Sequence, residues 1–374
     1  MGADGAMADA AVLQRLVDAL RHRGPDGEGA YTARNVALGQ TRLAIIDLET
    51  GNQPLYEPGG AVLVANGEIY NYVELRAQLA GEEFATQSDC EPPLHLYRKY
   101  GLDFVDHLRG MYAIALYDPI EGQLVLARDP FGIKPLYYAQ TDHGFAFASE
   151  PQALIESGMV APRVNPTALA ELLQLQFTTG AETVFESITR VLPGESVVVR
   201  DGRVVARRRR SVLPSDGVAD WSEESALVFL DAALRDSVEV HQRSDVPYGM
   251  FLSGGVDSSA LLALMSELNS QPVQAFTAGF VGTSVPDERE HARELARITG
   301  AEMTDLAIDA EMFWRDLPKI AASMDDPAAD YAMVPTYFLA QAVNAAGLKV
   351  VLTGEGGDEL FAGYGRYRSA MRPW

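Results

Sequence analysis

The spacing of apolar residues changes its character near the middle of the chain. Up to about residue 210, short apolar runs alternate with turns, and only a few stretches, such as 10–20, carry a helical stripe. From residue 222 onward, strand-like apolar runs alternate with amphipathic helical stripes. The first pattern predicts an α+β sandwich and the second predicts a parallel α/β sheet. We therefore expect two domains, 1–212 and 223–374, joined by a polar linker at 213–222 that contains Pro and Gly.

The apolar run 246–252 leads into a turn rich in glycine and serine, and an apolar helical run follows at 260–268. This order predicts a phosphate-binding loop, because glycines bring backbone N–H groups close to a ligand and a helix N-terminus favours negative charge. No Gly-Lys-Ser/Thr follows, so the segment is not a Walker loop. The donors expected to bind pyrophosphate are Ser253, Gly254, Gly255, Ser258 and Ser259.

A second glycine turn, 354–359, follows the strand-like run 349–353. Ligands of parallel sheets lie beyond the carboxyl ends of the strands, where both glycine turns are expected. Asp257 and Asp358 could then share Mg²⁺ from opposite turns, and Glu355 could steer a substrate or accept a proton. For 354–357 alone, an ordinary tight turn around glycine explains the residues about equally well.

A second group of polar residues lies in the first half, at ends of strands and starts of helices. Asn66 and the Gly67 N–H could donate to an oxyanion, Arg42 suits a carboxylate, and Asp89 suits an ammonium group. Turns and caps explain the spacing equally well, and Asp89 is also expected to be the N-cap of a helix. The pattern supplies no nucleophile, because Cys90 has no base or histidine beside it and favours a structural role.

Composition narrows the class of protein. The net charge is 30 − 52 = −22, which disfavours broad nucleic-acid binding. The single cysteine cannot form an internal disulfide, which suits a reducing cytosol. The chain has no apolar run of membrane-spanning length and no signal peptide, so we expect a cytoplasmic protein with no membrane partner.

Seven stretches together resemble the glutamine-dependent asparagine synthetases of the asparagine synthase B type. They occur in the family's order over nearly the whole chain, so the resemblance is specific. The matching stretches are His22 to Gly27, Arg42 to Asp47, Asn66 to Asn71, Ser88-Asp89, Arg128 to Tyr138, Ser253 to Ser259 and Gly354 to Glu359.

The resemblance implies a fold and a reaction for each half. The first half would be an N-terminal-nucleophile glutaminase domain, a four-layer αββα sandwich of the class II glutamine amidotransferases. The second would be an ATP-pyrophosphatase domain, a parallel α/β fold of the adenine-nucleotide α-hydrolase type. The first hydrolyses glutamine and passes ammonia through an internal channel. The second uses ATP and Mg²⁺ to adenylate the aspartate side-chain carboxylate, and ammonia then displaces AMP to give asparagine. Relatives are often dimers, which implies a homodimer.

The resemblance also assigns residues. Glu355 would serve the acyl-adenylate step, Asn66 and Gly67 would be catalytic, and Asp257 and Asp358 would be metal partners. The positions implied for glutamine binding are Arg42, Leu43, Ile45, Asn66, Gly67, Glu68 and Asp89. The positions implied for ATP binding are Leu252, Ser253, Gly254, Gly255, Asp257, Ser258, Ser259, Ala278, Thr353 and Gly354.

Three features depart from the family pattern. The family begins Met-Cys-Gly-Ile and uses that Cys as the glutaminase nucleophile, whereas this sequence begins Met1-Gly2, so as written it is expected not to hydrolyse glutamine. The family continues into helices that carry a catalytic lysine, whereas this sequence ends at Trp374. The glutamine-binding motifs nevertheless remain, which favours a clipped gene with an in-frame Met-Cys-Gly start upstream.

Two other interpretations stay open at this point. β-Lactam synthetases and related ligases adenylate a carboxylate and use an internal amine, which fits the missing Cys but not the retained Arg42, Asn66 and Asp89. A catalytically inactive fragment with a binding role fits the end at Trp374. An aspartate-dependent ATP–pyrophosphate exchange assay separates the three interpretations.

Overall fold

The computed structural model describes residues 1–213, 220–284 and 287–372. The chain divides into two compact units: Met1–Ala219 with Met324–Asp330, and Asp220–Ser323 with Tyr331–Trp374. Most of the expected linker, at 214–219, lies outside the described residues. One segment, 324–330, belongs to the first unit although the helices on either side of it belong to the second. In the described ranges no helix is both long enough and apolar enough to cross a membrane.

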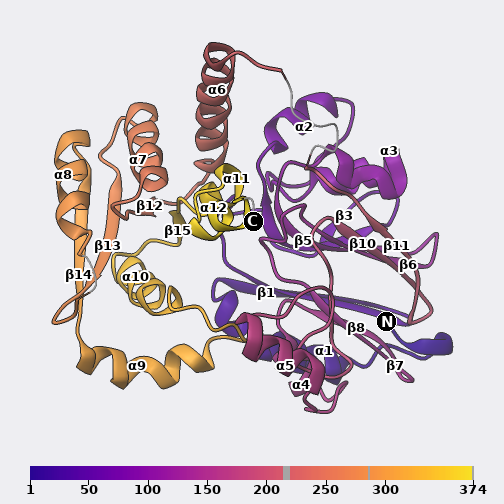
Figure 1. Cartoon of the computed structure of the whole chain (residues 1–374). Helices are drawn as coiled ribbons and strands as arrows, with labels where there is room; N and C mark the ends of the chain where they lie inside the picture. The colour runs from indigo at the N-terminus through magenta and orange to yellow at the C-terminus, as the bar shows by residue number, and fades with distance from the viewer. Residues whose placement is uncertain (214–219, 285–286, 373–374) are drawn as a thin grey trace. The chain divides into compact units, whose positions relative to one another are not determined.

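Strands dominate the first unit (Figure 1). Its six-stranded sheet has the order β11-β10-β6-β5-β4-β3, and smaller sheets have the orders β1-β2 and β8-β7-β9. The strands are β1 (Gly27–Ala33), β2 (Val36–Arg42), β3 (Leu55–Tyr56), β4 (Val62–Ile69), β5 (Gly110–Asp118), β6 (Gln123–Arg128), β7 (Tyr137–Thr141), β8 (Gly144–Ala148), β9 (Thr189–Arg190), β10 (Glu195–Arg200) and β11 (Arg203–Arg209). The helices are η1 (Ala3–Gly5), α1 (Ala10–Ala19), η2 (Arg21–Arg23), α2 (Tyr72–Gln78), α3 (Pro92–Tyr100), η3 (Gly101–His107), α4 (Pro151–Glu156) and α5 (Pro166–Leu175).

Three apolar clusters arrange these elements in layers. One joins α2, α3 and η3 to a face of the six-stranded sheet and includes Leu75, Leu94 and Ile114. A second lies between the six-stranded sheet and the smaller sheets, where Val64 and Phe145 are buried together. A third packs α1 and α4 against the outer face of β7 and β8. Helices, sheet, sheet and helices therefore succeed one another, which is the αββα sandwich that the resemblance implies.

The second unit alternates strands and helices. Its four-stranded sheet has the order β14-β13-β12-β15, and all its pairings are parallel. The elements are α6 (Glu223–His241), β12 (Tyr248–Phe251), α7 (Val256–Leu268), β13 (Gln274–Phe280), α8 (Arg289–Thr299), β14 (Glu302–Ile308), α9 (Ala310–Ala322), α10 (Met333–Ala345), β15 (Val350–Leu352), α11 (Gly357–Phe361) and α12 (Gly365–Ala370).

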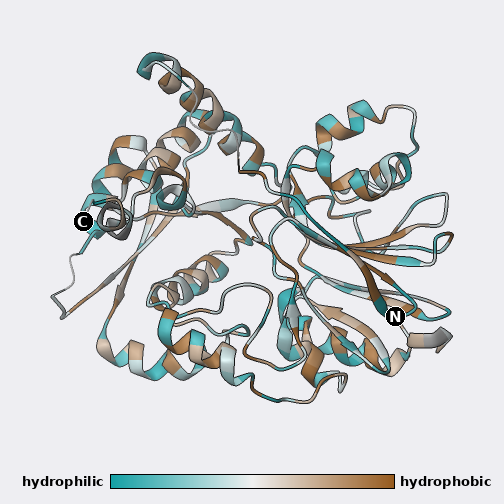
Figure 2. Ribbon diagram, turned by 45° about the vertical axis from the view of Figure 1, so that its right-hand side comes forward, coloured by the Kyte–Doolittle hydropathy of each residue, from teal (hydrophilic) through white to brown (hydrophobic). Residues whose placement is uncertain are grey.

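Both faces of this sheet are covered, as a parallel sheet requires. Val238 of α6, Leu262 of α7 and Ala292 of α8 share one cluster with Met250 of β12. On the other face, Ile320 of α9 and Phe338 of α10 pack with Ile308 at the end of β14. Figure 2 shows hydrophobic residues gathered on the strands, while the helices carry both hydrophilic and hydrophobic positions. The result is the α/β domain that the alternating pattern predicts.

Candidate functional site

The first unit contains a cavity of about 630 Å³. It is lined from all three sheets of this unit and from the loops that follow β2 and precede α3. All the positions that the resemblance implies for glutamine binding contribute to its wall, although they are spread over 48 positions of sequence, 89 − 42 + 1. They are Arg42, Leu43, Ile45, Asn66, Gly67, Glu68 and Asp89.

Asn66 and Gly67 lie on β4, which pairs with β5 along its length. The Asn66 Nδ2 atom is buried and has no hydrogen-bond partner among the described residues. Leaving a buried donor unpaired is unfavourable, so this group is ready for an acceptor supplied by a ligand. Gly67 has a packing reason to be glycine, since a Cβ there would lie 2.6 Å from the Cα of Tyr112 on β5.

Arg42 ends β2 and is only 7% exposed. Its guanidinium donates to the carbonyls of Ile46 and Asp47, at 3.1 and 2.5 Å, and to Asn52 Oδ1 at 2.9 Å. Arg42 therefore holds the loop that carries Leu43 and Ile45 against the cavity. The Ala44 N–H, in the same loop, donates to Asp26 Oδ2 at 2.8 Å. A ligand carboxylate would have to use the N–H groups of Arg42 that remain.

Asp89 is not the helix N-cap that its position suggested. Helix α3 begins at Pro92 with Glu91 as N-cap residue, and Asp89 Oδ2 instead accepts the Ile69 N–H at 2.7 Å. Burial raises the pKa of Asp89 to about 6, against the lowering effect of the Ile69 N–H and other donors. Burial also raises the pKa of Glu68 to about 7, with Lys134 opposing and Asp89 adding to that rise. The cavity thus holds two buried carboxyl groups that repel one another.

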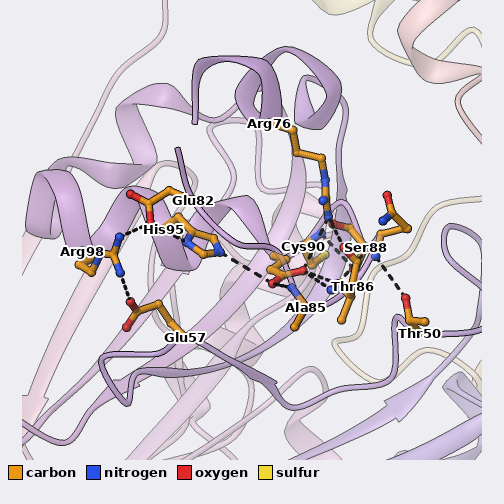
Figure 3. Close-up of polar contacts among 12 residues, drawn as sticks. Thr50, Glu57, Arg76, Glu82, Ala85, Thr86, Ser88, Cys90, His95 and Arg98 are labelled. Atoms are coloured by element: carbon orange, nitrogen blue, oxygen red, sulfur yellow. Dashed lines mark hydrogen bonds and ion pairs between the residues drawn. The ribbon is translucent and has the colours of Figure 1, made fainter. Parts of the chain in front are cut away.

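The segment before α3 is fixed by a polar network (Figure 3). The Glu91 carboxylate accepts the N–H groups of Ala85 and Thr86, at 2.7 and 2.8 Å. Arg76 donates to the carbonyls of Thr86 and Ser88, at 3.0 and 2.8 Å. Glu91 and Arg76 therefore bind the N–H groups and the carbonyls of this loop. The loop is fixed, and Asp89, which follows it, is held in one position in the cavity wall.

Cys90 is buried at 3% exposure and also lines the cavity. Burial, together with the neighbouring Asp89 carboxylate, raises the pKa of its thiol well above the usual value. A reactive cysteine needs the opposite environment, one that lowers the thiol pKa. The geometry therefore supports the structural role that the sequence favoured for Cys90.

The two glycine turns of the second unit follow neighbouring parallel strands, β12 and β15. In the first turn, Ser258 Oγ lies 2.9 Å from Ser253 Oγ, and Ser259 Oγ donates to the Gly255 carbonyl at 2.6 Å. A Cβ on Gly354 would lie 3.0 Å from the Ser258 backbone N, so the second turn passes directly beside the first. Ala278 lies on β13, the other neighbour of β12. The ATP positions implied by the resemblance thus lie together at the carboxyl ends of the parallel strands.

The carboxylates expected to hold a metal lie on these turns. A Cβ on Gly357 would come within 2.4 Å of Asp257 Oδ2, so the Asp257 carboxylate rests against the second turn. Neither Asp257 nor Asp358 has a side-chain partner among the described residues. No cluster of three or more metal-ligand residues occurs in the described ranges. Two carboxylates fit Mg²⁺, which is commonly held by one or two carboxylates with phosphate oxygens and water.

The structure adds two residues to which the sequence assigned no role. Glu288 Oε2 accepts the Gly254 N–H at 3.0 Å, so a carboxylate occupies a donor of the glycine turn. Lys134 lines the cavity of the first unit beside Glu68. No local pattern marks Glu288, because its partner is 34 residues away. Lys134 belongs to one of the stretches that carry the family resemblance, 128–138. Only its position in the fold distinguishes it from the other residues of that stretch.

Two family models match the chain. Residues 2–209 match the glutamine amidotransferase domain, and residues 230–374 match asparagine synthase. The first match covers more than half of the chain and contains the whole set of cavity positions described above. The second contains both glycine turns.

Curated relatives agree with these matches. The glutamine-hydrolysing asparagine synthetase 1 of Bacillus subtilis strain 168 is 38% identical over 96% of this chain and 57% of its own length. Asparagine synthetase B of Escherichia coli K12 is 34% identical over 94% of this chain and 60% of its own length. A putative asparagine synthetase of Methanocaldococcus jannaschii is 30% identical over 96% of this chain and 74% of its own length. The chain thus spans less than two thirds of the first two relatives.

Solved structures resemble the chain more distantly. The glutamine phosphoribosylpyrophosphate amidotransferase of B. subtilis, complexed with ADP and GMP, aligns with a TM-score of 0.45 at 16% identity. The alignment covers 86% of this chain and 93% of that one.

Proposed function

We propose a function from one premise: the chain belongs to the family of glutamine-hydrolysing asparagine synthetases. The cavity of the first unit binds glutamine, and the paired glycine turns of the second unit bind ATP with Mg²⁺. The reaction is the ATP-dependent amidation of the aspartate side-chain carboxylate with ammonia from glutamine. We assign the two domains to 1–212 and 223–374, with the segment 324–330 belonging to the first compact unit, and the active form is a homodimer in the cytoplasm.

The observation that carries the glutamine assignment is the unpartnered Asn66 Nδ2 in the cavity wall. An amide carbonyl that enters the cavity would accept this donor and become more polarised as negative charge develops on its oxygen. Arg42 is the cation for the α-carboxylate, and Glu68 and Asp89 are the anions for the α-ammonium. One cavity therefore contains a partner for each polar end of glutamine.

The ATP assignment rests on the glycine turns at the carboxyl edge of the parallel sheet. Their N–H and hydroxyl groups can bind pyrophosphate, and α7 begins beside them with its N-terminus at Val256. Mg²⁺ would be held by Asp257 and Asp358 and would neutralise phosphate charge. Glu355, exposed between the glycines of the second turn, serves the acyl-adenylate step.

Isothermal titration calorimetry with L-glutamine tests the first half of the proposal. Asn66→Ala should weaken binding by about tenfold, the effect of losing one good hydrogen bond of about 1.4 kcal/mol. The exposed Asp142→Asn in the same unit is the matched control and should leave binding unchanged. A parent chain that does not bind glutamine at all would contradict the assignment.

ATP–pyrophosphate exchange tests the second half. Exchange that depends on aspartate and is lost in Glu355→Gln supports adenylation of aspartate. If exchange depends on a different carboxylic acid, that acid and not aspartate is the acceptor. A folded protein that binds ATP but shows no exchange with any acid would refute the proposed reaction.

A further inference from the structure

The cavity of the first unit contains two buried acidic residues whose negative charges are unfavourable close together. Glu68 and Asp89 are 7% and 5% exposed and lie in the same wall. Two buried carboxylates cannot both stay ionised unless positive charge lies nearby, because desolvation and mutual repulsion both favour the protonated form. A protonated carboxyl group would bind an ammonium ion poorly, so the cavity needs a compensating cation.

Four Lys and Arg side chains line the cavity, and three of them are engaged elsewhere. Arg42 donates to the backbone carbonyls of its own loop. Arg23 forms an ion pair with Glu150 at 2.7 Å, and Arg15 donates to the Ser157 carbonyl at 2.8 Å. The ammonium group of Lys134 makes neither a hydrogen bond nor an ion pair with any described residue. Burial lowers the pKa of Lys134, whereas Glu68 beside it acts to raise that pKa, and Lys134 in turn opposes the rise in the Glu68 pKa.

The backbone around Lys134 is rigidly fixed, which sets where the side chain begins. Its N–H donates to Asp129 Oδ2 at 3.0 Å, and its carbonyl accepts from Arg128 Nε at 2.7 Å. Asp129 is fully buried and also accepts the N–H groups of Phe131 and Ile133, at 3.1 and 2.9 Å. These hydrogen bonds fix the turn 129–132 and so place Lys134 at the cavity wall.

We propose that Lys134 is a positioning residue that favours the ionised form of Glu68, so that the cavity can hold the α-ammonium of glutamine. This inference rests on the proposed glutamine-binding function. The titratable groups around Glu68 are Lys134, Asp89, Tyr70 and Cys90. Lys134 is the cation of this set, and its own surroundings include Arg23 and Asp129. Its removal takes away the cation that opposes the effect of Asp89 on Glu68.

The sign of the effect follows from the position of the Glu68 pKa. That pKa is raised by burial to about 7 even with Lys134 present. Without the ammonium group the Glu68 pKa rises further, so a larger fraction of Glu68 is protonated at neutral pH. Glutamine affinity should then fall near pH 7 and recover at higher pH, as Glu68 ionises.

Calorimetry of glutamine binding across a pH series tests this inference with three variants. Lys134→Met should displace the pH profile by about one unit upward, which from a Glu68 pKa of about 7 weakens binding about fivefold at pH 7. Lys134→Arg keeps the charge and should restore the profile of the parent chain. Lys99→Met, which removes an exposed lysine on α3, should behave as the parent does.

A ligand-free measurement separates this inference from the proposed function. Carbon-13 NMR of chain labelled at the glutamate side-chain carboxyls gives the Glu68 pKa directly, with Glu68→Gln to assign the signal. An upward shift of about one unit in Lys134→Met, and no shift in Lys134→Arg, is the expected result. An unchanged Glu68 pKa, or a loss of affinity that is equal at every pH, would overturn the role of Lys134. Failure of the parent chain to bind glutamine would overturn the proposed function, whereas the Glu68 pKa in the variants decides the role of Lys134 by itself.

Discussion

Asp326 offers a sharp test of how the first unit is held together. It lies in the segment 324–330, which interrupts the sequence of the second unit but belongs to the first. Its Oδ2 accepts from the Tyr137 hydroxyl at 2.7 Å and from Arg190 Nη2 at 2.5 Å. The Ala329 N–H donates to the Gln176 carbonyl at 2.7 Å, so the backbone of the segment is also attached to this unit.

The expected cost of Asp326→Asn follows from burial. The side chains of Arg190 and Asp326 are 14% and 17% exposed, so the pair is largely removed from water. Breaking a fully buried pair by removing one charge costs about 3 to 5 kcal/mol. Asp326 Oδ1 is buried and has no hydrogen-bond partner in the described part of the chain, and asparagine can still accept from Tyr137. Both facts reduce the loss, and we expect Asp326→Asn to destabilise the first unit by about 2 to 3 kcal/mol.

The tryptophan distribution lets the two units be followed separately. Trp221 and Trp314 are the tryptophans among the described residues and both belong to the second unit, so we expect their fluorescence to report on that unit during denaturant unfolding. Circular dichroism reports on both units. Asp326→Asn should move the unfolding transition of the first unit, seen by circular dichroism, to lower denaturant concentration. The transition seen by tryptophan fluorescence should stay unchanged. Asp142→Asn should change neither transition. A change below about 0.5 kcal/mol, the usual range for surface substitutions, would refute the reasoning.

Three further predictions concern other parts of the chain. Gly357→Ala should weaken ATP binding in calorimetry by at least about tenfold, because a Cβ would displace the Asp257 carboxylate, whereas Gly365→Ala has open space around it. The pKa of Glu91 is lowered to about 2, because the His95 ring at 3.7 Å and hydrogen bonds from Thr86 and Ala85 outweigh burial. Its stabilising effect is present above about 4.5 and lost as the pH falls through about 2, so Glu91→Gln should lose less stability than the parent on acidification in that window. Cys90 should react slowly with iodoacetamide in the native protein and rapidly in denaturant, and equal rates by mass spectrometry would contradict its burial.

The sequence predicted the arrangement of the second unit well, for a physical reason. Alternating strands and helices leave few alternatives to a parallel sheet, and a parallel sheet places its strand ends at one edge. Both glycine turns therefore had to lie near that edge. Their direct contact, in which Gly357 faces Asp257, depends on β15 pairing with β12, and no local pattern specifies that neighbour.

The first unit was less predictable because long-range hydrogen bonds build it. Asp89 was expected to cap the helix that follows it, but its carboxylate accepts an N–H from Ile69, 20 residues earlier. Local propensity cannot rank a nearby cap against a partner that only tertiary packing brings close. Lys134 was visible as part of a motif, but its unpaired charge could be recognised only after the other cations of the cavity had been accounted for.

This contrast predicts how the two candidate sites respond to substitution. The glycine turns depend on short-range geometry and on one strand pairing, so damage there should stay local to the second unit. The cavity depends on contacts such as Ala44 with Asp26 and Gln87 with Asp47, which join segments 18 and 40 residues apart. Loosening one of these contacts moves a whole loop and several cavity residues with it. Substitutions that never touch glutamine should therefore weaken its binding, whereas ATP binding should respond mainly to changes within the turns themselves.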